Sequence, residues 1–395
     1  MNYILFDDSS WDNLLPLTFT RPTGEIRIGI LKISEKWEKF VGSKISFLTK
    51  EYLSCKYPVQ IASDNVLLNG SVLPSLEMVH SISSLQPGQL LRSGEVLLAA
   101  RLNAEQVEDF KHSKFEKFET KAFEAGVTKI NYPWQIFSYN GEALADDFKL
   151  ITKGRVSAPI SATNRVLGAD NIFLEEGAIV EFAILNATTG PIYIGKDAEI
   201  MEGSVVRGSL AMCEHSALKL AAKVYGPTTI GPHSKIGGEV NNAVIFGYSS
   251  KAHDGFLGNA VLGEWCNLGA DTNNSNLKNN YAEVRIWNYV QERFIGTGLQ
   301  FCGLIMADHS KSGINTMFNT GTVVGVSANI FGSGFPRSFI PSFSWGGAQG
   351  FSEYSLPKVY EVAELVMKRR DMVLSECDKQ ILKHVFEITA KFRSF

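Results

Sequence analysis

Residues 194–240 read IGKDAEIMEGSVVRGSLAMCEHSALKLAAKVYGPTTIGPHSKIGGEV, and this stretch repeats with a period of six. Every sixth residue from Ile194 to Ile236 is apolar, and the residues four positions further on, from Ala198 to Val240, are mostly small. A helix repeats about every 3.6 residues and a strand every two, so neither selects every sixth position. A triangular parallel β-coil does, because each flat face takes six residues, with the apolar one inward and the small one at the corner. We therefore expect turns of about eighteen residues.

The six-residue pattern continues beyond this stretch, with slips. We expect the inward positions further along the chain to be Leu262, Leu268, Ile295, Phe301, Ala307, Ile314 and Thr320. Asn273–Arg293 breaks the pattern and is interpreted as a loop that projects from the coil.

The first 150 residues have a different pattern, in which short apolar runs alternate with helix-like stretches. The predicted strands are Tyr3–Phe6, Ile45–Leu48, Val66–Leu68 and Val96–Ala100, and the predicted helices are Gly29–Phe40 and Ala104–Phe118. This alternation indicates an α/β domain.

A helical pattern returns after Gly350. Ser355 is expected to begin one helix, with Pro357 in its first turn, and Ser375 with Asp378 forms a capping-box pattern that begins a second. We expect these helices to cap the open end of the coil, because an uncapped coil exposes strand edges. The predicted domains are an α/β domain (1–155), the coil (156–350) and the C-terminal helices (351–395).

Composition and charge exclude several classes of protein. The 395 residues include 38 Lys and Arg against 41 Asp and Glu, a net charge of −3, which predicts no bulk attraction to nucleic acid or to an anionic membrane. No apolar run approaches the ~18 residues of a membrane span, and Asp7 and Asp8 interrupt the N-terminus where a signal peptide would be apolar. We expect a cytoplasmic protein whose five scattered cysteines are buried thiols.

Two stretches narrow the interpretation of the coil, namely KAHDGFLG at 251–258 and LGEWCNLGA at 262–270. They resemble the acetyltransferase half of the bifunctional N-acetylglucosamine-1-phosphate uridyltransferase/glucosamine-1-phosphate acetyltransferases, whose coil is the left-handed β-helix of hexapeptide-repeat acyltransferases. The resemblance implies that His253 is catalytic, that Asn267 contacts the sugar, and that Asn276 is a later active-site residue. It also implies acetyl-CoA as co-substrate.

The same resemblance extends to neighbouring positions. It places Glu239 near the sugar amine and Lys223 on the sugar phosphate, while Phe256 stands where the family has Tyr. Asn241 replaces a family lysine, and Lys278 on the projecting loop is expected to compensate for this lost cation.

Coenzyme A contacts and assembly also follow from the resemblance. The residues implied for coenzyme A are Ala270, His309, Ser310 and Lys311, and the basic run Lys368–Arg370 is either a further contact or a favourable helix end. Coils of this family trimerise through one face, which implies a homotrimer. No metal site is expected, because zinc-binding β-coil carbonic anhydrases need two histidines five residues apart and this chain has none.

The N-terminal domain resembles the sugar nucleotidyltransferases through LLPLTFTRP at 14–22, which matches part of their phosphate-holding loop. Arg21 is the cation that remains there, with Arg27 as a second candidate. VLLNGS at 66–71 resembles the strand whose following Asp binds Mg²⁺, but Ser71 stands at that position. Nucleotidyl transfer would need Mg²⁺, for which Asp7 or Asp8 could supply a ligand.

These observations predict an enzyme that acetylates glucosamine 1-phosphate and is joined to a domain that would make the UDP-sugar. His253 suits the general base because imidazole titrates near neutral pH. Two alternatives stay open: the N-terminal domain is a non-catalytic nucleotide-sugar sensor, or the acetyltransferase acts on another amino sugar.

Overall fold

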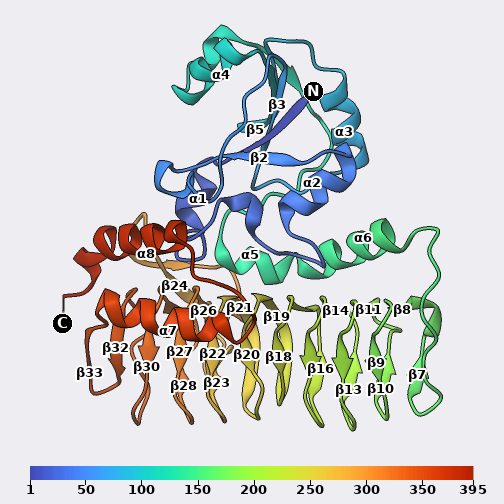
Figure 1. Ribbon diagram of the computed structural model, residues 1–395, viewed down its shortest axis with the longest axis vertical. Coiled ribbons are helices and arrows are strands. Elements are labelled where there is room, and N and C mark those ends of the chain that lie inside the picture. The colour runs from blue at the N-terminus through green and yellow to red at the C-terminus, as the bar shows by residue number, and fades with distance from the viewer. Residues whose placement is uncertain (395) are drawn as a thin grey trace. The chain divides into compact units, whose positions relative to one another are not determined.

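The computed structural model describes residues 1–394, which form two compact units. Unit 1 comprises Met1–Leu14, Arg21–Ile26 and Leu31–Asn131, and unit 2 comprises the remaining described residues. The expected fold class is confirmed, because an α/β domain precedes a left-handed parallel β-coil and C-terminal helices (Figure 1).

Unit 1 is built on a six-stranded mixed sheet with strand order β2-β1-β3-β5-β4-β6. Of its three parallel strands β1, β2 and β3, β3 is fully buried and β1 is buried over its second half, whereas β2 at the edge of the sheet is mostly half-buried. The strands are β1 (Asn2–Phe6), β2 (Ile45–Leu48), β3 (Asn65–Asn69), β4 (Gln89–Ser93), β5 (Val96–Leu102) and β6 (Glu119–Ala122). The helices of this unit are α1 (Ser10–Asn13), α2 (Ile33–Val41), α3 (Leu76–Ser83) and α4 (Ala104–Lys111).

The four predicted strands are present, but both predicted helices are shorter than expected. Helix α2 begins at Ile33 rather than Gly29, because Gly29 has a φ of +72° and the Lys32 N–H donates to Glu35 Oε2 at 2.7 Å, which caps the helix there. Helix α4 ends at Lys111, and only the 3₁₀ turn Phe115–Lys117 follows it.

The main segment of unit 2 begins with helices α5 (Pro133–Ser138) and α6 (Asn140–Thr152), which pack on the strands of the coil. The coil contains a 13-stranded and a 10-stranded sheet. The first holds β7 (Arg165–Leu167), β8 (Ile172–Leu174), β10 (Ile184–Asn186), β11 (Ile192–Ile194), β13 (Val205–Arg207), β14 (Leu210–Met212), β16 (Lys223–Tyr225), β17 (Thr228–Ile230), β19 (Glu239–Gly247), β21 (Phe256–Glu264), β26 (Ile305–Met306), β29 (Val323–Val324) and β31 (Phe339–Ile340). The second holds β9 (Ile179–Val180), β12 (Glu199–Ile200), β15 (Ala217–Leu218), β18 (Lys235–Ile236), β20 (Ser250–Lys251), β22 (Asn267–Leu268), β27 (Lys311–Ser312), β30 (Asn329–Ile330), β32 (Ser344–Gly347) and β33 (Gly350–Glu353).

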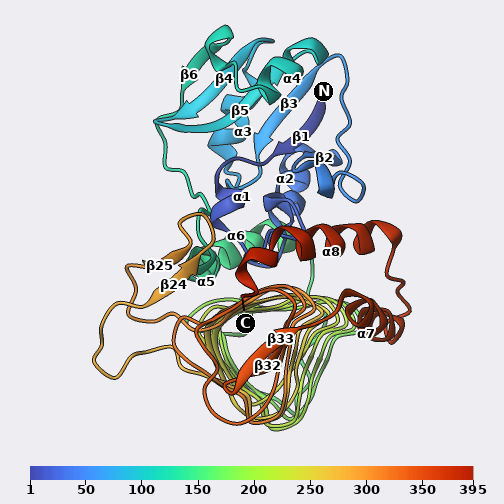
Figure 2. The same ribbon diagram turned by 90° about the vertical axis from the view of Figure 1, so that its left-hand side faces the viewer.

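The six-residue repeat is confirmed in the stretch that predicted it. Glu199 pairs with Ala217 and Ala217 with Lys235, partners that are eighteen positions apart in the chain. All eight apolar register positions from Ile194 to Ile236 are buried, as are the eight small partner positions from Ala198 to Val240. The triangular outline of the coil is visible end-on (Figure 2).

The expected register is wrong beyond Leu268. The chain leaves the coil between β23 (Asn273–Asn274) and residue 303, and this excursion forms the hairpin of β24 (Arg285–Asn288) with β25 (Arg293–Gly296). Ile295 therefore belongs to the hairpin. Phe301 and Ile314 are exposed and Thr320 is half-buried, whereas the inward positions of the last turns are Met306, Ser312, Phe318, Val324 and Ile330.

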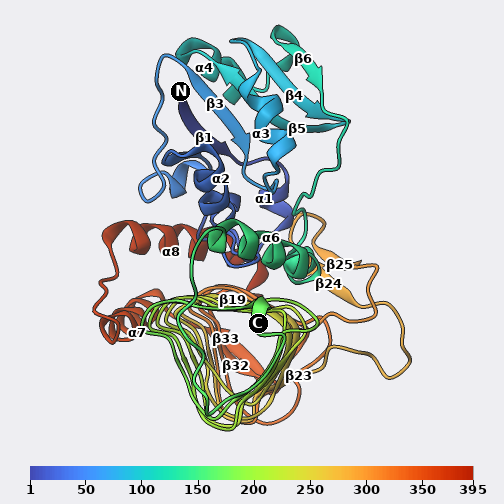
Figure 3. The ribbon, with the colours of Figure 1, turned by 90° about the vertical axis from the view of Figure 1, so that its right-hand side faces the viewer.

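The two C-terminal helices are present as α7 (Leu356–Lys368) and α8 (Glu376–Ile388), and Ser375 and Asp378 form the predicted capping box. Helix α7 lies beside the coil rather than across its end (Figures 2 and 3). Arg370, which follows it, donates from Nη2 to the His233 carbonyl at 3.3 Å, in the middle of the coil. The parallel ladder ends instead at β33, which pairs antiparallel with β32.

Two further expectations concern the membrane and the cysteines. No helix among residues 1–394 is long and apolar enough to cross a membrane. Cys213, Cys266 and Cys302 are buried as expected, but Cys377 is half-buried and Cys55 is exposed, since it lies in the turn that follows β2.

Candidate functional sites

A hollow of about 390 Å³ opens on one corner of the coil, and His253 lines it. The His253 side chain is exposed, and Ala270 of the next turn lines the same hollow. The structure thus brings together one residue expected to be catalytic and one expected to contact coenzyme A. The residues that line the hollow are Lys219, Leu220, Gly238, Ala252, His253, Asp254, Ala270 and Asp271.

Three of the predicted substrate residues form a row beside this hollow. Lys223 of β16 pairs in register with Glu239 of β19, and Glu239 pairs with Phe256 of β21. Their side chains leave the same face of the coil, because in-register residues of parallel strands point the same way. The row begins next to the hollow, since Gly238, which lines the hollow, precedes Glu239.

Tyr225 holds the carboxylate of this row and was missed in the sequence. Its hydroxyl donates to Glu239 Oε1 at 2.6 Å. This hydrogen bond, with partial burial, raises the pKa of Tyr225 to about 12, so the proton stays on the phenol at neutral pH. Tyr225 lies two positions after Lys223 on β16, so the alternation of side chains along a strand places both side chains on the same face. This spacing is the sequence signal that could have identified Tyr225.

The two asparagines lie on different parts of the coil. Asn276 donates from Nδ2 to Asn259 Oδ1 at 2.8 Å, and the same Nδ2 lies close to Gly258, two residues beyond Phe256. Asn276 therefore lies beside β21, near the end of the row that Phe256 occupies. Asn267 is exposed on the other sheet, where it pairs in register with Ser250 and Lys311.

The residues expected to hold coenzyme A have different surroundings. Ser310 is fully buried, where its Oγ donates to the Gly325 carbonyl at 2.6 Å and accepts from the Ala328 N–H at 3.0 Å. Both contacts stay inside the coil. Lys311 donates from Nζ to the His309 carbonyl at 3.0 Å, and burial lowers its pKa.

Lys278 lies on the excursion between β23 and residue 303. Its Nζ donates to the Glu283 carbonyl at 2.8 Å, and its side chain is exposed. The ammonium group thus braces the excursion in this conformation.

In unit 1, polar side chains gather where parallel strands β1 and β3 end. Asp7 follows β1, and its carboxylate accepts from the Thr23 N–H at 2.8 Å and from Thr49 Oγ1 at 2.5 Å. Burial raises the pKa of Asp7 to about 6. In open α/β sheets, ligands bind at the carboxyl ends of strands where the strand order reverses, and β1 lies between β2 and β3 at such a point.

Asp8, the next residue, is held by cationic and neutral donors. Its Oδ1 accepts from the Ser10 N–H at 2.9 Å, while its Oδ2 accepts from Asn69 Nδ2 at 3.0 Å and lies 2.8 Å from Lys129 Nζ. Burial opposes ionisation of this carboxyl group, but the bonds from Lys129 and Asn69 outweigh it and lower the pKa of Asp8.

These residues do not fit a resident Mg²⁺. All four carboxylate oxygens of Asp7 and Asp8 accept hydrogen bonds from the protein, and Lys129 already neutralises Asp8. Ser71 offers only a hydroxyl, which donates to Asn69 Oδ1 at 2.6 Å. Nowhere in residues 1–394 do three or more His, Cys, Asp or Glu side chains group to hold a metal ion.

The two arginines that were candidates for binding the phosphate belong to different units. Arg21 belongs to unit 1, where it is buried and its carbonyl accepts from Trp11 Nε1 at 3.1 Å. Arg27 belongs to unit 2, where its Nε donates to the Phe246 carbonyl at 3.1 Å. Arg27 therefore supports the coil.

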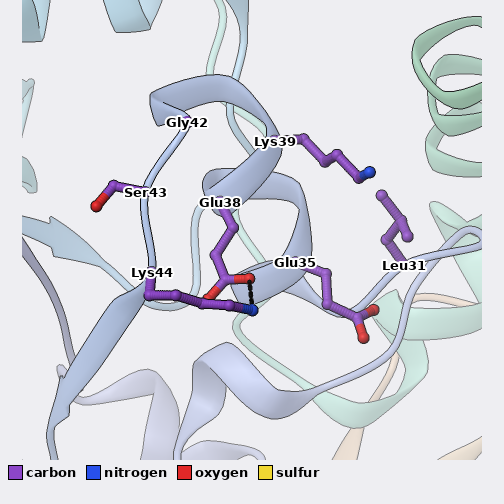
Figure 4. Close-up of a pocket in the computed structure, with 7 residues that line it drawn as sticks. All are labelled: Leu31, Glu35, Glu38, Lys39, Gly42, Ser43 and Lys44. Atoms are coloured by element: carbon purple, nitrogen blue, oxygen red, sulfur yellow. Dashed lines mark hydrogen bonds and ion pairs between the residues drawn. The ribbon is translucent and has the colours of Figure 1, made fainter.

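A second hollow, of about 480 Å³, lies at the C-terminal end of α2 (Figure 4). Lys44 Nζ lies 2.9 Å from Glu38 Oε2 across it. Its lining contains no residue that the sequence singled out and consists of Leu31, Glu35, Glu38, Lys39, Gly42, Ser43 and Lys44.

The class of protein that emerges is an α/β domain similar to the sugar nucleotidyltransferases, joined to a β-coil with a polar row beside a hollow. Residues 3–156 match the family described as sugar nucleotidyl transferase. A bifunctional sugar-1-phosphate nucleotidylyltransferase/acetyltransferase of Sulfurisphaera tokodaii is 28% identical over 144 residues. This match covers 36% of the chain and 35% of the relative, so the chain spans about a third of the length of the curated relative.

One solved structure was also similar to part of the chain. The polysialic acid O-acetyltransferase OatWY aligns with 48% of this chain and 87% of its own, at 10% sequence identity and a TM-score of 0.24.

Proposed function

We propose that the chain is an acetyltransferase that acts on an amino-sugar 1-phosphate, joined to a domain that binds a nucleoside triphosphate and would convert the product to a UDP-sugar. One observation carries the proposal. His253 faces an open hollow beside the row of Lys223, Glu239 and Phe256, so a base, a cation and a carboxylate lie along one edge of the coil.

Each residue of the row has a role in this reaction. The Lys223 ammonium binds the sugar phosphate, and the Glu239 carboxylate, fixed by Tyr225, orients the substrate ammonium group. His253 accepts one proton from that ammonium group. The free amine nitrogen then attacks the thioester carbonyl carbon, the new C–N bond forms and the C–S bond breaks. The nitrogen loses its second proton to the departing thiolate, so that coenzyme A leaves as the thiol, and the first proton passes from His253 to solvent.

The asparagines and the neighbouring turns complete the substrate contacts. We assign Asn276 and Phe256 to the sugar ring, and Asn267 to a sugar hydroxyl or the thioester carbonyl. Ala270 lines the hollow at the acetyl end of coenzyme A, while Lys311 and His309 lie one turn further along.

A homotrimer fits the surface that continues the row. Ile184 pairs with Val205, and Val205 pairs with Lys223, so two exposed apolar side chains lead directly into the polar row. Phe182, two residues before Ile184, and Leu220, three residues before Lys223, are also exposed. Contiguous exposed apolar side chains mark association surfaces, so a second copy against this face would cover them and enclose the substrate.

In unit 1, we assign the triphosphate to the carboxyl ends of β1 and β3, with Arg21 as its cation. Because Asp7 and Asp8 are already satisfied by the protein, Mg²⁺ would arrive as the counter-ion of the triphosphate substrate. The alternative of a nucleotide-sugar sensor is favoured by Ser71 and by the Asp8–Lys129 ion pair, which leave no free metal carboxylate.

A panel of substrates decides between these functions. Purified protein is given acetyl-CoA with glucosamine 1-phosphate, galactosamine 1-phosphate or a UDP-amino sugar, and separately N-acetylglucosamine 1-phosphate with UTP and Mg²⁺. Acetylation of one amino-sugar 1-phosphate supports the proposal, and pyrophosphate release in the second reaction supports nucleotidyl transfer. Binding of UTP without pyrophosphate release identifies the sensor, and acetylation of none of the acceptors contradicts the acetyltransferase.

A further inference from the structure

One inward position of the coil is occupied by a lysine. Lys251 of β20 pairs in register with Ile236 of β18, and the same row continues to Leu218 and Ile200. These three aliphatic residues fill the interior of the coil, and Lys251 is as buried as they are, at 1% exposure. Burying an ammonium group is costly unless it is fully hydrogen-bonded, so this break in the repeat calls for a reason.

The ammonium group of Lys251 binds the corner that carries His253. Its Nζ donates to the His253 carbonyl at 2.5 Å and to the Asp254 carbonyl at 3.1 Å. Burial lowers the pKa of Lys251 to about 8, with Asp254 and Asp271 acting in the opposite direction. The amine therefore retains hydrogen-bond donors on both sides of that pH, because a neutral amine still carries two N–H groups.

The corner, formed by residues 252–255, is also constrained by the next turn of the coil. Gly255 has a φ of +110°, and a Cβ at that position would lie 2.2 Å from the Thr272 carbonyl oxygen of the next turn. The corner is thus pressed against the following turn on one side and bonded to Lys251 on the other. Together these contacts fix the backbone at His253, which lines the hollow.

We propose that Lys251 is a positioning residue, which holds the backbone of His253 so that the imidazole faces the substrate. This inference rests on the proposed function, because it gives His253 its role. It adds a residue that acts from inside the coil and that never touches the substrate.

The test replaces Lys251 with methionine, which has a similar length, no donor and an apolar character suited to the interior of the coil. We expect kcat for acetyl transfer to fall by about 10- to 100-fold, the scale of a misplaced catalytic group, with KM for acetyl-CoA within about twofold. The midpoint of thermal unfolding should stay equal or rise, because the substitution restores an apolar inward residue. A purely structural lysine would give the opposite pattern, with lower stability and unchanged kcat.

A matched control is Lys235→Met, since Lys235 is an exposed lysine next to the same row in β18. It should leave kcat unchanged. If Lys251→Met does not fold, Lys251→Leu gives the same comparison with the residue type found at Leu218.

Hydrogen exchange provides a readout that does not depend on activity. Loss of the two bonds should speed amide exchange at residues 252–255 by at least about tenfold, while exchange in β18 and β22 stays unchanged. Unchanged exchange at the corner, or wild-type kcat in Lys251→Met when His253→Ala is inactive, overturns the inference. Wild-type protein that acetylates no acceptor while the corner still loosens would overturn the proposed function alone.

Discussion

At the scale of single residues, the hydrogen bond between Tyr225 and Glu239 makes a testable contribution to substrate binding. Tyr225→Phe removes the donor at 2.6 Å and frees the carboxylate to rotate. One such bond contributes about 1 kcal/mol, so we expect KM for the amino-sugar phosphate to rise about three- to tenfold while KM for acetyl-CoA is unchanged. Steady-state kinetics with each substrate varied in turn measures this.

The matched control is Tyr193→Phe, because Tyr193 donates to Glu175 Oε1 at 2.8 Å elsewhere on the coil. It should leave both KM values unchanged. Equal effects of the two substitutions would show that Tyr225 acts through general stability of the coil and would contradict the role assigned to Glu239.

A second residue-scale prediction concerns Asp7, whose pKa burial raises from 3.8 to about 6. Between these values the folded protein keeps a proton on Asp7 that the unfolded chain has lost. The free energy of unfolding therefore decreases through this group as pH rises from 4 to 6. Asp7→Asn keeps an acceptor for Thr23 and does not titrate, so its stability relative to wild type should increase over this window by up to roughly 3 kcal/mol.

Denaturant unfolding of both proteins at pH 4, 5, 6 and 7 measures the difference. A constant difference across this range would mean that Asp7 is already ionised in the folded protein at pH 4, which would contradict a pKa raised by burial.

Residue-scale features were predictable only where they belong to a pattern. The match of His253 to a catalytic histidine came from its sequence neighbours, but the bonds that hold the site could not be predicted. Tyr225 reaches Glu239 across a full turn of the coil, and Lys251 reaches two carbonyls that only the folded corner brings together. Lys251 lies fifteen residues after the inward Ile236 and so falls outside the six-residue register, which is why the sequence did not mark it as an inward position.

At the scale of elements, the coil was predictable where its repeat is uninterrupted. Between Ile194 and Ile236 each residue's environment depends on its place in a six-residue period, so the sequence alone indicates which side chains are inward. The excursion after β23 was expected as a projecting loop over 273–293, but its hairpin was not, because apolar residues of the hairpin such as Ile295 continue the six-residue pattern by coincidence. The register after the excursion is set by pairing across 44 residues, from Leu262 to Met306.

This difference in register gives a direct prediction. Val224→Asp and Phe318→Asp should both unfold the coil, because each buries an unpaired charge at a position exposed by only 1%. Ile314→Asp should be tolerated, since Ile314 is 70% exposed, and Lys235→Asp serves as the surface control. Circular dichroism and thermal unfolding report the result. Tolerance of Phe318→Asp together with unfolding by Ile314→Asp would restore the register first expected from the sequence.

At the scale of the whole molecule, the proposed function assigns a separate chemistry to each of the two units, and each can be tested separately. Unit 1 was expected to be α/β from its alternating pattern, and its sheet order then defines the strand ends where a nucleotide would bind. What the sequence could not indicate is that Arg27 lies in unit 2 although Arg21 lies in unit 1. The chain crosses between the units several times in its first thirty residues, and only tertiary contacts determine this.

We expect nucleotide binding by unit 1 to depend on Arg21. Triphosphates need cations to offset their charge, and Arg21 is the buried cation in the stretch that resembles the phosphate loop. In calorimetric titrations with UTP and Mg²⁺, Arg21→Ala should weaken binding at least about tenfold, as the loss of a charge-assisted contact does. Lys39→Ala, in the hollow beside α2, should bind as wild type does.

Equal binding by wild type and Arg21→Ala would remove Arg21 from the phosphate site. Absence of binding in both would show that unit 1 takes no nucleoside triphosphate.

The central claim is that the hollow at His253 is the site of acetyl transfer. Its most direct test is the release of coenzyme A thiol from acetyl-CoA in the presence of glucosamine 1-phosphate, compared between wild type, His253→Ala and His215→Ala. We predict sugar-dependent thiol release by wild type and by His215→Ala, and a loss of about 10²- to 10⁴-fold in His253→Ala, the usual contribution of a general base. Near wild-type turnover in His253→Ala, with its fold intact, would contradict the claim.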